Sequence, residues 1–197
     1  MLLTIPNLLS LLRLLLFPPT AWLAWQGGTA CNAAAAGLLL LMALTDILDG
    51  YLARHLHQRS EAGRVLDPLA DKICVGGLFL ILALRGRLPW WLAGMVIGRD
   101  ALILLAGAFL LGRYGRVTES NWFGKTTVGI LVATLVVQLV ELEALDSASL
   151  VLAALGLAVS TVAYGWRFVR ILTGKESPPE PAPRPKSLAS PTAVEPL

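Results

Sequence analysis

Charged residues are scarce in this sequence. They make up 15% of its 197 residues, whereas a soluble domain carries about a quarter. The apolar residues, 56% of the chain, fall in long blocks rather than in the stripes of amphipathic helices. The sequence therefore excludes an ordinary soluble domain. It predicts an all-α, polytopic integral membrane protein of one domain.

Cysteines are also few, and basic residues lack aromatic neighbours. Cys31 and Cys74 lie in different apolar regions and outside any metal-type spacing, so we interpret both as small buried hydrophobes. No stacking aromatics accompany the basic residues, so we expect no nucleic-acid partner. The net charge of +3 then reflects loop topology. The first residues lack a basic region and a cleavage site, so the first apolar run is expected to stay as a membrane span.

The apolar blocks predict six transmembrane helices after a short N-terminal interfacial segment. The helices are expected at residues 8–25, 33–53, 68–84, 92–111, 126–140 and 149–169. Residues 2–7 are short and contain Pro6, so we expect them to lie at the membrane surface. Asn7 or Ser10 is then expected to cap the first helix, because a side-chain oxygen there accepts a hydrogen bond from a free backbone N–H.

Three stretches depart from plain apolar helices. The pair Pro18-Pro19 predicts a kink or break in the first span, because proline removes a backbone donor and clashes with the preceding turn. Arg13 has two interpretations of equal weight: its side chain extends to the membrane interface, or it faces an anionic group. Residues 177–197 are rich in proline and predict a disordered tail after a transmembrane domain of residues 1–176.

The charges between the blocks predict the orientation in the membrane. Six spans place both termini on one side, and that side carries most basic residues: Arg54, Arg59, Arg64, Lys72, Arg113, Arg116, Lys125, Arg167, Arg170 and Lys175. The other side carries a neutral turn, the exceptional pair Arg85 and Arg87, and an acidic turn at residues 141–146. Because basic loops stay in the cytoplasm, we expect a multi-pass protein of the cell (inner or cytoplasmic) membrane.

Four aspartates flank the loop between the second and third predicted helices. Asp46 and Asp49 are three residues apart and Asp67 and Asp71 are four apart, so each pair shares a helix face. Four adjacent carboxylates cannot all ionise without counter-charge. Magnesium, manganese or calcium would supply it through oxygen ligands, and the lack of His or Cys argues against zinc. Two such ions form a recurrent clamp for displacement at phosphorus, here at the cytoplasmic membrane surface.

The aspartates belong to a motif of eight residues at fixed spacing. It reads Asp46-x2-Asp49-Gly50-x2-Ala53-Arg54-x8-Gly63-x3-Asp67-x3-Asp71, and Ile5-Pro6-Asn7-Leu8-Leu9-Ser10-x2-Arg13 precedes it. Both segments resemble those of the CDP-alcohol phosphotransferase (CDP-alcohol phosphatidyltransferase) family, which also has six membrane spans. The resemblance covers about residues 4–172 and leaves out the tail.

The resemblance implies an enzyme of phospholipid biosynthesis that works as a homodimer in the lipid bilayer. Enzymes of this family transfer a phosphatidyl group from CDP-diacylglycerol to an alcohol and release CMP. By resemblance, Asp46, Asp49 and Asp67 hold one Mg²⁺ or Mn²⁺, and Asp46, Asp67 and Asp71 hold a second. Asp71 is also the implied general base for the acceptor hydroxyl. The residues implied to contact the CDP-lipid are Ile5, Pro6, Asn7, Leu8, Gly50, Ala53, Arg54, Ser60 and Gly63.

The acceptor is expected at basic residues near cytoplasmic helix ends, which otherwise act only as topology determinants. These candidates are Arg99, Lys125, Arg167 and Arg170. The run Gly124-Lys125-Thr126-Thr127 resembles phosphatidylglycerophosphate synthases, whereas Arg99-Asp100 looks more like CDP-diacylglycerol-dependent cardiolipin synthases. The leading acceptor is the small phosphorylated alcohol glycerol 3-phosphate, giving phosphatidylglycerophosphate. The alternative is phosphatidylglycerol, giving cardiolipin; inositol phosphate, serine, ethanolamine and choline are less favoured.

Two other classes fit the sequence less well. A cation-binding membrane transporter would also use carboxylates. However, these lie at a membrane surface rather than at the midplane, and the motif has no inverted repeat. A catalytically inactive scaffold of the same fold is disfavoured because all four aspartates are intact.

Overall fold

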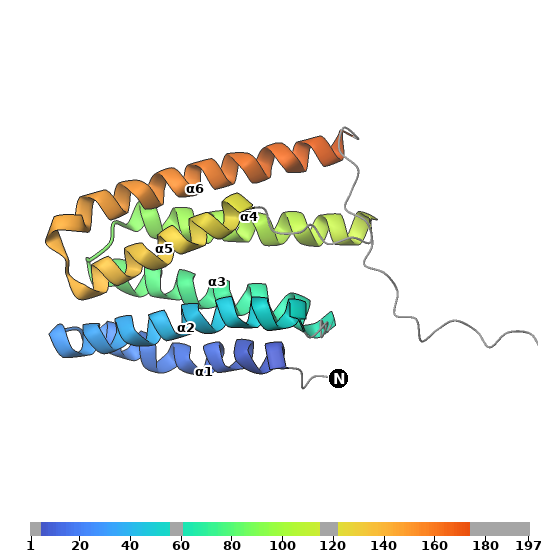
Figure 1. Ribbon diagram of the computed structural model, residues 1–197. Helices are drawn as coiled ribbons and strands as arrows, with labels where there is room; N and C mark the ends of the chain where they lie inside the picture. Colours follow the sequence, from blue (N-terminus) through green and yellow to red (C-terminus); the bar gives the residue numbers. More distant parts are fainter. Residues whose placement is uncertain (1–4, 56–60, 115–121, 174–197) are drawn as a thin grey trace, which may run out of the picture.

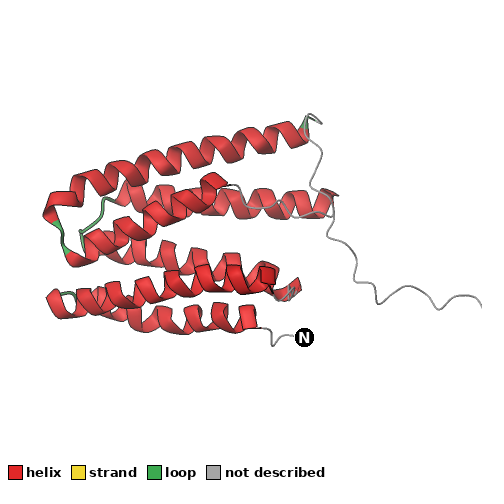
Figure 2. Ribbon diagram, in the orientation of Figure 1, coloured by secondary structure: helices red, strands yellow, loops and turns green. Residues whose placement is uncertain are grey.

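The computed structural model describes residues 5–55, 61–114 and 122–173. Within these ranges it describes the side chains of residues 8–48, 70–110, 112, 124 and 126–173. The described residues form six α-helices: α1 (Ile5–Gln26), α2 (Thr29–His55), α3 (Glu61–Leu84), α4 (Trp90–Tyr114), α5 (Trp122–Val140) and α6 (Glu143–Leu172). The helices run up and down in one bundle (Figure 1), and no strand occurs among them (Figure 2). The predicted all-α fold is confirmed for the described part of the chain.

Four of the helices contain segments that are long and apolar enough to cross a membrane. These segments are Leu8–Gln26, Thr29–Leu48, Trp90–Leu110 and Glu143–Leu172, with mean hydropathies of 1.4 to 1.8. In α5, the apolar segment Thr126–Val140 is shorter. The first part of α3 carries the charged residues of the motif, which lowers its hydropathy. The six predicted helices are present in the described part of the chain. Four of them are long and apolar enough to cross a membrane, and crossing by α3 and α5 stays a prediction.

The first helix, α1, differs from the expectation at its start and at its two prolines. Because α1 begins at Ile5, residues 5–7 are helical, and the expected interfacial segment is reduced to residues outside the described part. Asn7 and Ser10 lie within this helix rather than before it, so the predicted caps are wrong. The helix also continues through its two prolines without a break. Neighbouring helices in an apolar bundle make such prolines tolerable.

The core of the bundle is built mainly from leucines of α3, α4, α5 and α6, and Ala24 of α1 and Leu39 of α2 also belong to it. Its largest fully buried side chains include Phe79, Leu82, Leu92, Leu135 and Leu157. Large apolar side chains also cover the outer faces, and they include Leu105, Val162 and Trp166, which are 68%, 70% and 69% exposed. An apolar outer surface of this extent is expected where lipid replaces water as the neighbour.

The helix ends opposite the aspartates are tied together by the exceptional arginines. Arg85 donates to the backbone oxygen of Ala24 at 2.6 Å and to Asn32 Oδ1 at 3.2 Å. Arg87 pairs with Glu141 at 3.2 Å, and Asn32 also donates to Glu141 at 3.0 Å. These contacts join the turn after α3 to α1, α2 and α5. The two arginines thus have local acceptors and a local counter-charge, which accounts for their presence on the predicted acidic side.

Candidate active site

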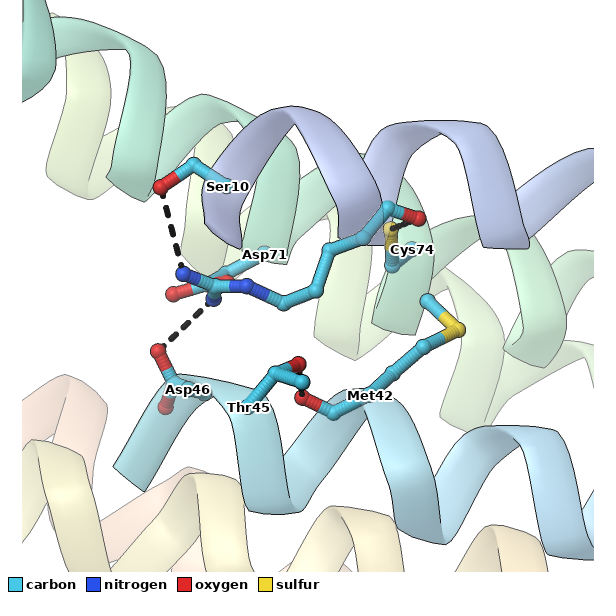
Figure 3. A network of polar contacts seen from close by, with 7 residues as sticks. Ser10, Met42, Thr45, Asp46, Asp71 and Cys74 are labelled. Carbon is cyan, nitrogen blue, oxygen red and sulfur yellow. Dashed lines mark hydrogen bonds and ion pairs between the residues drawn. The ribbon is translucent and has the colours of Figure 1, made fainter. Parts of the chain in front are cut away.

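A buried arginine of α1 joins α1 to α2 and α3. Arg13 is 2% exposed. Its Nη1 donates to Asp46 Oδ1 at 2.7 Å and to Asp71 Oδ1, and its Nη2 donates to Ser10 Oγ at 3.4 Å. Figure 3 shows the guanidinium between the two carboxylates, one from α2 and one from α3. A charge inside an apolar bundle is costly unless it is paired, and here two carboxylates pair with it.

The structure decides between the two interpretations of Arg13. Its side chain does not extend to the interface but faces anionic groups, 33 and 58 residues away in the sequence. Helix α1 packs against both α2 and α3, and so brings the arginine to both aspartates. Sequence reasoning missed Ser10 as a partner of this arginine, although their spacing of three residues places them on one helix face.

Packing of α2 and α3 against α1 brings together one aspartate from each predicted pair. The side chains of Asp46 and Asp71 are 45% and 37% exposed, whereas Arg13 is 3% exposed. The carboxylates therefore lie closer to the surface than the arginine does. We call this end of the bundle, where α1 and α3 begin and α2 ends, the open end. Asp49 and Asp67 belong to the same two helices, but their side chains lie outside the described residues. Among described side chains, no group of three or more metal-type ligands occurs.

Except for Ser60, the other predicted donor-binding residues belong to the same end of the bundle. This end is formed by the start of α1, the end of α2 and the start of α3 (Figure 1). Leu8 is 48% exposed there. Backbone positions in these helices are described for Ile5, Pro6, Asn7, Gly50, Ala53 and Gly63, but not their side chains. Arg54 likewise lies in α2 with its side chain outside the description, and Ser60 lies wholly outside the described residues.

Arg99 of α4, a predicted acceptor residue, is engaged by its own chain. It is 6% exposed, and its Nη1 donates to Asp100 Oδ1 at 2.7 Å. Its Nη2 donates to Ser160 Oγ of α6 at 2.8 Å, and its guanidinium lies 5.5 Å from the ring centre of Tyr164. These contacts stabilise the α4–α6 interface. Sequence reasoning missed both α6 residues, although their spacing of four places them on one face.

The remaining predicted acceptor residues lie on α5 and α6. Arg167 is half-buried and Arg170 is exposed on α6, and Arg167 follows Ser160 by two helical turns. Lys125 belongs to α5, but its side chain lies outside the described residues. The structure thus brings Arg99 against the helix that carries Arg167 and does not show a shared pocket for the four.

Gly124, in the run that resembles an acceptor motif, allows a close approach between α5 and α6. A Cβ atom built at this buried position would lie 2.6 Å from the hydroxyl oxygen of Tyr164. Any other residue here would therefore displace that ring, which in turn lies beside Arg99. The glycine couples the start of α5 to the α4–α6 contact.

Lys72 connects the aspartate site to this second polar cluster. Its ammonium donates to the backbone oxygen of Asp100 at 2.9 Å. Since Lys72 directly follows Asp71 in α3, this bond and the Arg13 contact restrain the same turn from two sides. From the sequence, this lysine was expected only to contribute to the orientation of the chain in the membrane.

Comparison with known proteins decides the family. The family model described as CDP-alcohol phosphatidyltransferase matches residues 3–165. The chain belongs to the CDP-alcohol phosphatidyltransferase family. The match spans α1 to α5 and most of α6, and so includes both the Arg13 site and the Arg99 cluster.

Curated relatives within the CDP-alcohol phosphatidyltransferase family carry two different names. A "Cardiolipin synthase (CMP-forming) / mitochondrial hydrolase fusion protein" of Schizosaccharomyces pombe is 45% identical over 54% of this chain and 18% of its own length. A "Putative cardiolipin synthase" of Mycobacterium bovis is 32% identical over 85% of this chain and 80% of its own. A "Probable phosphatidylglycerophosphate synthase" of Mycobacterium tuberculosis is 31% identical over 60% of this chain and 57% of its own. The chain thus spans less than two thirds of the first and third relatives.

Proposed function

We propose that this protein transfers a phosphatidyl group from CDP-diacylglycerol to the hydroxyl of an alcohol, with release of CMP, in phospholipid synthesis. One observation carries the proposal. Asp46 and Asp71, from two helices of a chain that belongs to the CDP-alcohol phosphatidyltransferase family, converge on one guanidinium at the predicted position of the site. The acceptor oxygen attacks the β-phosphorus, and the bond from that phosphorus to the bridging oxygen breaks, so the oxygen leaves with CMP.

The donor set fits two divalent cations, Mg²⁺ or Mn²⁺. Two carboxylates already lie close together and half-exposed at the open end of the bundle. Asp49 and Asp67 belong to the same helices, and hard oxygen ligands of this kind suit these ions. In the proposal Asp46, Asp49 and Asp67 hold one ion, and Asp46, Asp67 and Asp71 hold the other. When bound, the ions would neutralise the donor pyrophosphate and stabilise charge on the departing CMP.

The protein's own residues would bind the donor and move one proton. Asp71 accepts the proton of the acceptor hydroxyl as that oxygen attacks, and its carboxylate is oriented by Arg13. The small residues Gly50 and Ala53 would let the nucleotide approach α2 closely, and Arg54 would pair with phosphate oxygens. The other proposed donor contacts are Ile5, Pro6, Asn7, Leu8, Ser60 and Gly63.

The proposed acceptor carries a phosphoglycerol group, either as free glycerol 3-phosphate or as phosphatidylglycerol. Lys125, Arg167 and Arg170 remain candidates to bind its phosphate. Two observations favour phosphatidylglycerol over glycerol 3-phosphate, the leading acceptor from sequence. Both terminal nitrogens of Arg99 already donate to Asp100 and Ser160, so this arginine is less available to a free phosphate than expected. The Mycobacterium bovis relative, which covers 85% of this chain, is named as a putative cardiolipin synthase.

In the membrane, we expect all six helices to span the bilayer, with the aspartate end at the cytoplasmic face and the acyl chains of the donor extending into lipid between helices.

A homodimer is part of the proposal. Gly94 and Gly98 lie on an exposed face of α4, where no described atom lies within 4 Å of a Cβ built at either position. This leaves room for a helix of a second copy.

A CMP-release assay on the purified chain tests the function. The protein is mixed with CDP-diacylglycerol, Mg²⁺ or Mn²⁺, and one acceptor at a time: glycerol 3-phosphate, phosphatidylglycerol, inositol phosphate or serine. We expect CMP and a matching lipid product with a phosphoglycerol acceptor, and no product in EDTA. Lack of CMP release with every alcohol offered would refute the transferase activity and favour the alternative, a cation-binding membrane transporter.

A further inference from the structure

Arg13 is the buried charge on which the two described aspartates converge. One of its terminal nitrogens, Nη1, donates to Oδ1 of both carboxylates, while Nη2 donates to Ser10 Oγ. Ser10 is itself 0% exposed, so the guanidinium is held from its own helix as well as from α2 and α3 (Figure 3). Three helices therefore meet at one positive group.

Two carboxylates that share one nitrogen lie close enough to repel each other. An arginine stays protonated in proteins, so its charge is present under all ordinary conditions. Because the guanidinium is almost fully buried, its attraction to the carboxylates is less screened than at a surface. Without Arg13, repulsion would drive Asp46 and Asp71 apart and weaken the packing of α2 and α3 against α1.

We propose that Arg13 is a positioning residue for the metal site, which holds Asp46 and Asp71 together before ions bind. Its buried Nη1 donates a hydrogen bond to one oxygen of each carboxylate, while both carboxylates stay half-exposed at the open end. The inference rests on the proposed function, since it requires both aspartates to be ion ligands. Partners behind the ligands of a metal site commonly orient them.

A purely structural ion pair would make the same contacts, so the test must respond to ions. If Arg13 supplies the counter-charge before ions bind, a variant without it depends on ions for its stability. Ion binding to the folded state then raises the melting temperature more than it does in the wild type. If Arg13 only links helices, its loss lowers the melting temperature equally with and without ions.

The experiment compares thermal unfolding of the full-length protein in detergent, in EDTA and with Mn²⁺. We expect Arg13→Gln to melt lower than wild type in EDTA and to show at least about a twofold larger rise with Mn²⁺. Arg13→Lys keeps a charge without the planar fork, so we expect an intermediate rise. It also keeps the test decisive if the glutamine variant does not fold. Arg85→Gln is the matched control at the opposite end, because it removes contacts to Ala24 and Asn32 away from the aspartates.

The outcomes separate this inference from the proposed function. A Mn²⁺-induced rise in the folded Arg13 variants equal to that of the wild type and of Arg85→Gln would overturn the positioning role. That result would not contradict the proposed metal site. A wild-type protein that shows neither a Mn²⁺-dependent rise nor Mn²⁺ binding in an electron paramagnetic resonance titration would remove the metal site and the inference together. CMP release by the wild type reports on the transferase independently.

Discussion

Replacing Ser160 by alanine is expected to weaken the contact between α4 and α6. Ser160 is 0% exposed, and its hydroxyl oxygen accepts a hydrogen bond of 2.8 Å from Arg99, which is 6% exposed. Alanine leaves that charged donor without this acceptor in an apolar interior. Such a loss costs about 1–3 kcal/mol in soluble proteins, and interhelical hydrogen bonds in membranes contribute about 0.6–1.7 kcal/mol. We therefore expect a cost of about 1–2 kcal/mol.

Thermal unfolding in detergent measures this cost. For a chain of this size, the expected fall in melting temperature is about 2–8 °C. Thr161→Val is the matched control, because the neighbouring Thr161 hydroxyl donates to the backbone oxygen of Leu157 within α6, at 2.7 Å. That variant loses a hydroxyl without losing a contact to α4, so its melting temperature should change much less.

A double-mutant cycle tests the physical reason. In an Arg99→Met background the charged donor is gone, so Ser160→Ala should cost less than in the wild type. The reasoning is refuted if Ser160→Ala behaves like Thr161→Val, or if its full cost persists without the arginine. A normal acceptor affinity in Ser160→Ala would further show that this contact supports the fold rather than the proposed acceptor site.

Three further predictions concern the aspartate site, the close helix contact and the opposite end. Asp71→Asn should abolish CMP release while the protein stays folded and membrane-inserted, as judged by circular dichroism and membrane fractionation; near-normal turnover would remove Asp71 as the base. Gly124→Ala should destabilise the protein by about 1–3 kcal/mol, because its Cβ would meet the Tyr164 hydroxyl at 2.6 Å; an unchanged melting temperature would contradict this close packing. Glu141→Gln should cost less than about 1 kcal/mol, because this residue and its partner Arg87 are 48% and 36% exposed; CMP release should be unchanged, and a large loss would show that this end contributes to function.

Much of the helical architecture could be predicted because it depends on local composition. The apolar blocks placed all six helices, and their ends were wrong by a few residues where a polar group or a turn was ambiguous. Helix α2 begins at Thr29 rather than at Ala33, because Gly27 and Gly28 adopt positive φ angles of 74° and 83° and complete the turn in two residues. The charged start of α3 also belongs to the helix, which begins at Glu61 and continues through Gly63 and Pro68.

The candidate site was predictable in part. The spacing predicted four adjacent carboxylates, and the structure brings one aspartate of each pair, Asp46 and Asp71, to the same guanidinium. The partners of Arg99 were not predictable. Ser160 lies 61 residues away, and a serine within an apolar helix has no local feature that marks it as an acceptor.

By itself, the sequence determined what depends on neighbours along the chain: helical segments, the apolar outer surface and the matched pairs of carboxylates. Only the tertiary structure decided which charges neutralise one another. Arg13 was open to two interpretations because the energy of a buried charge depends on groups that reach it through space. Its partners are 33 and 58 residues away, and they meet it only because α1 packs against α2 and α3 together. The same physical reason applies to Arg99, whose bond to Ser160 links α4 and α6.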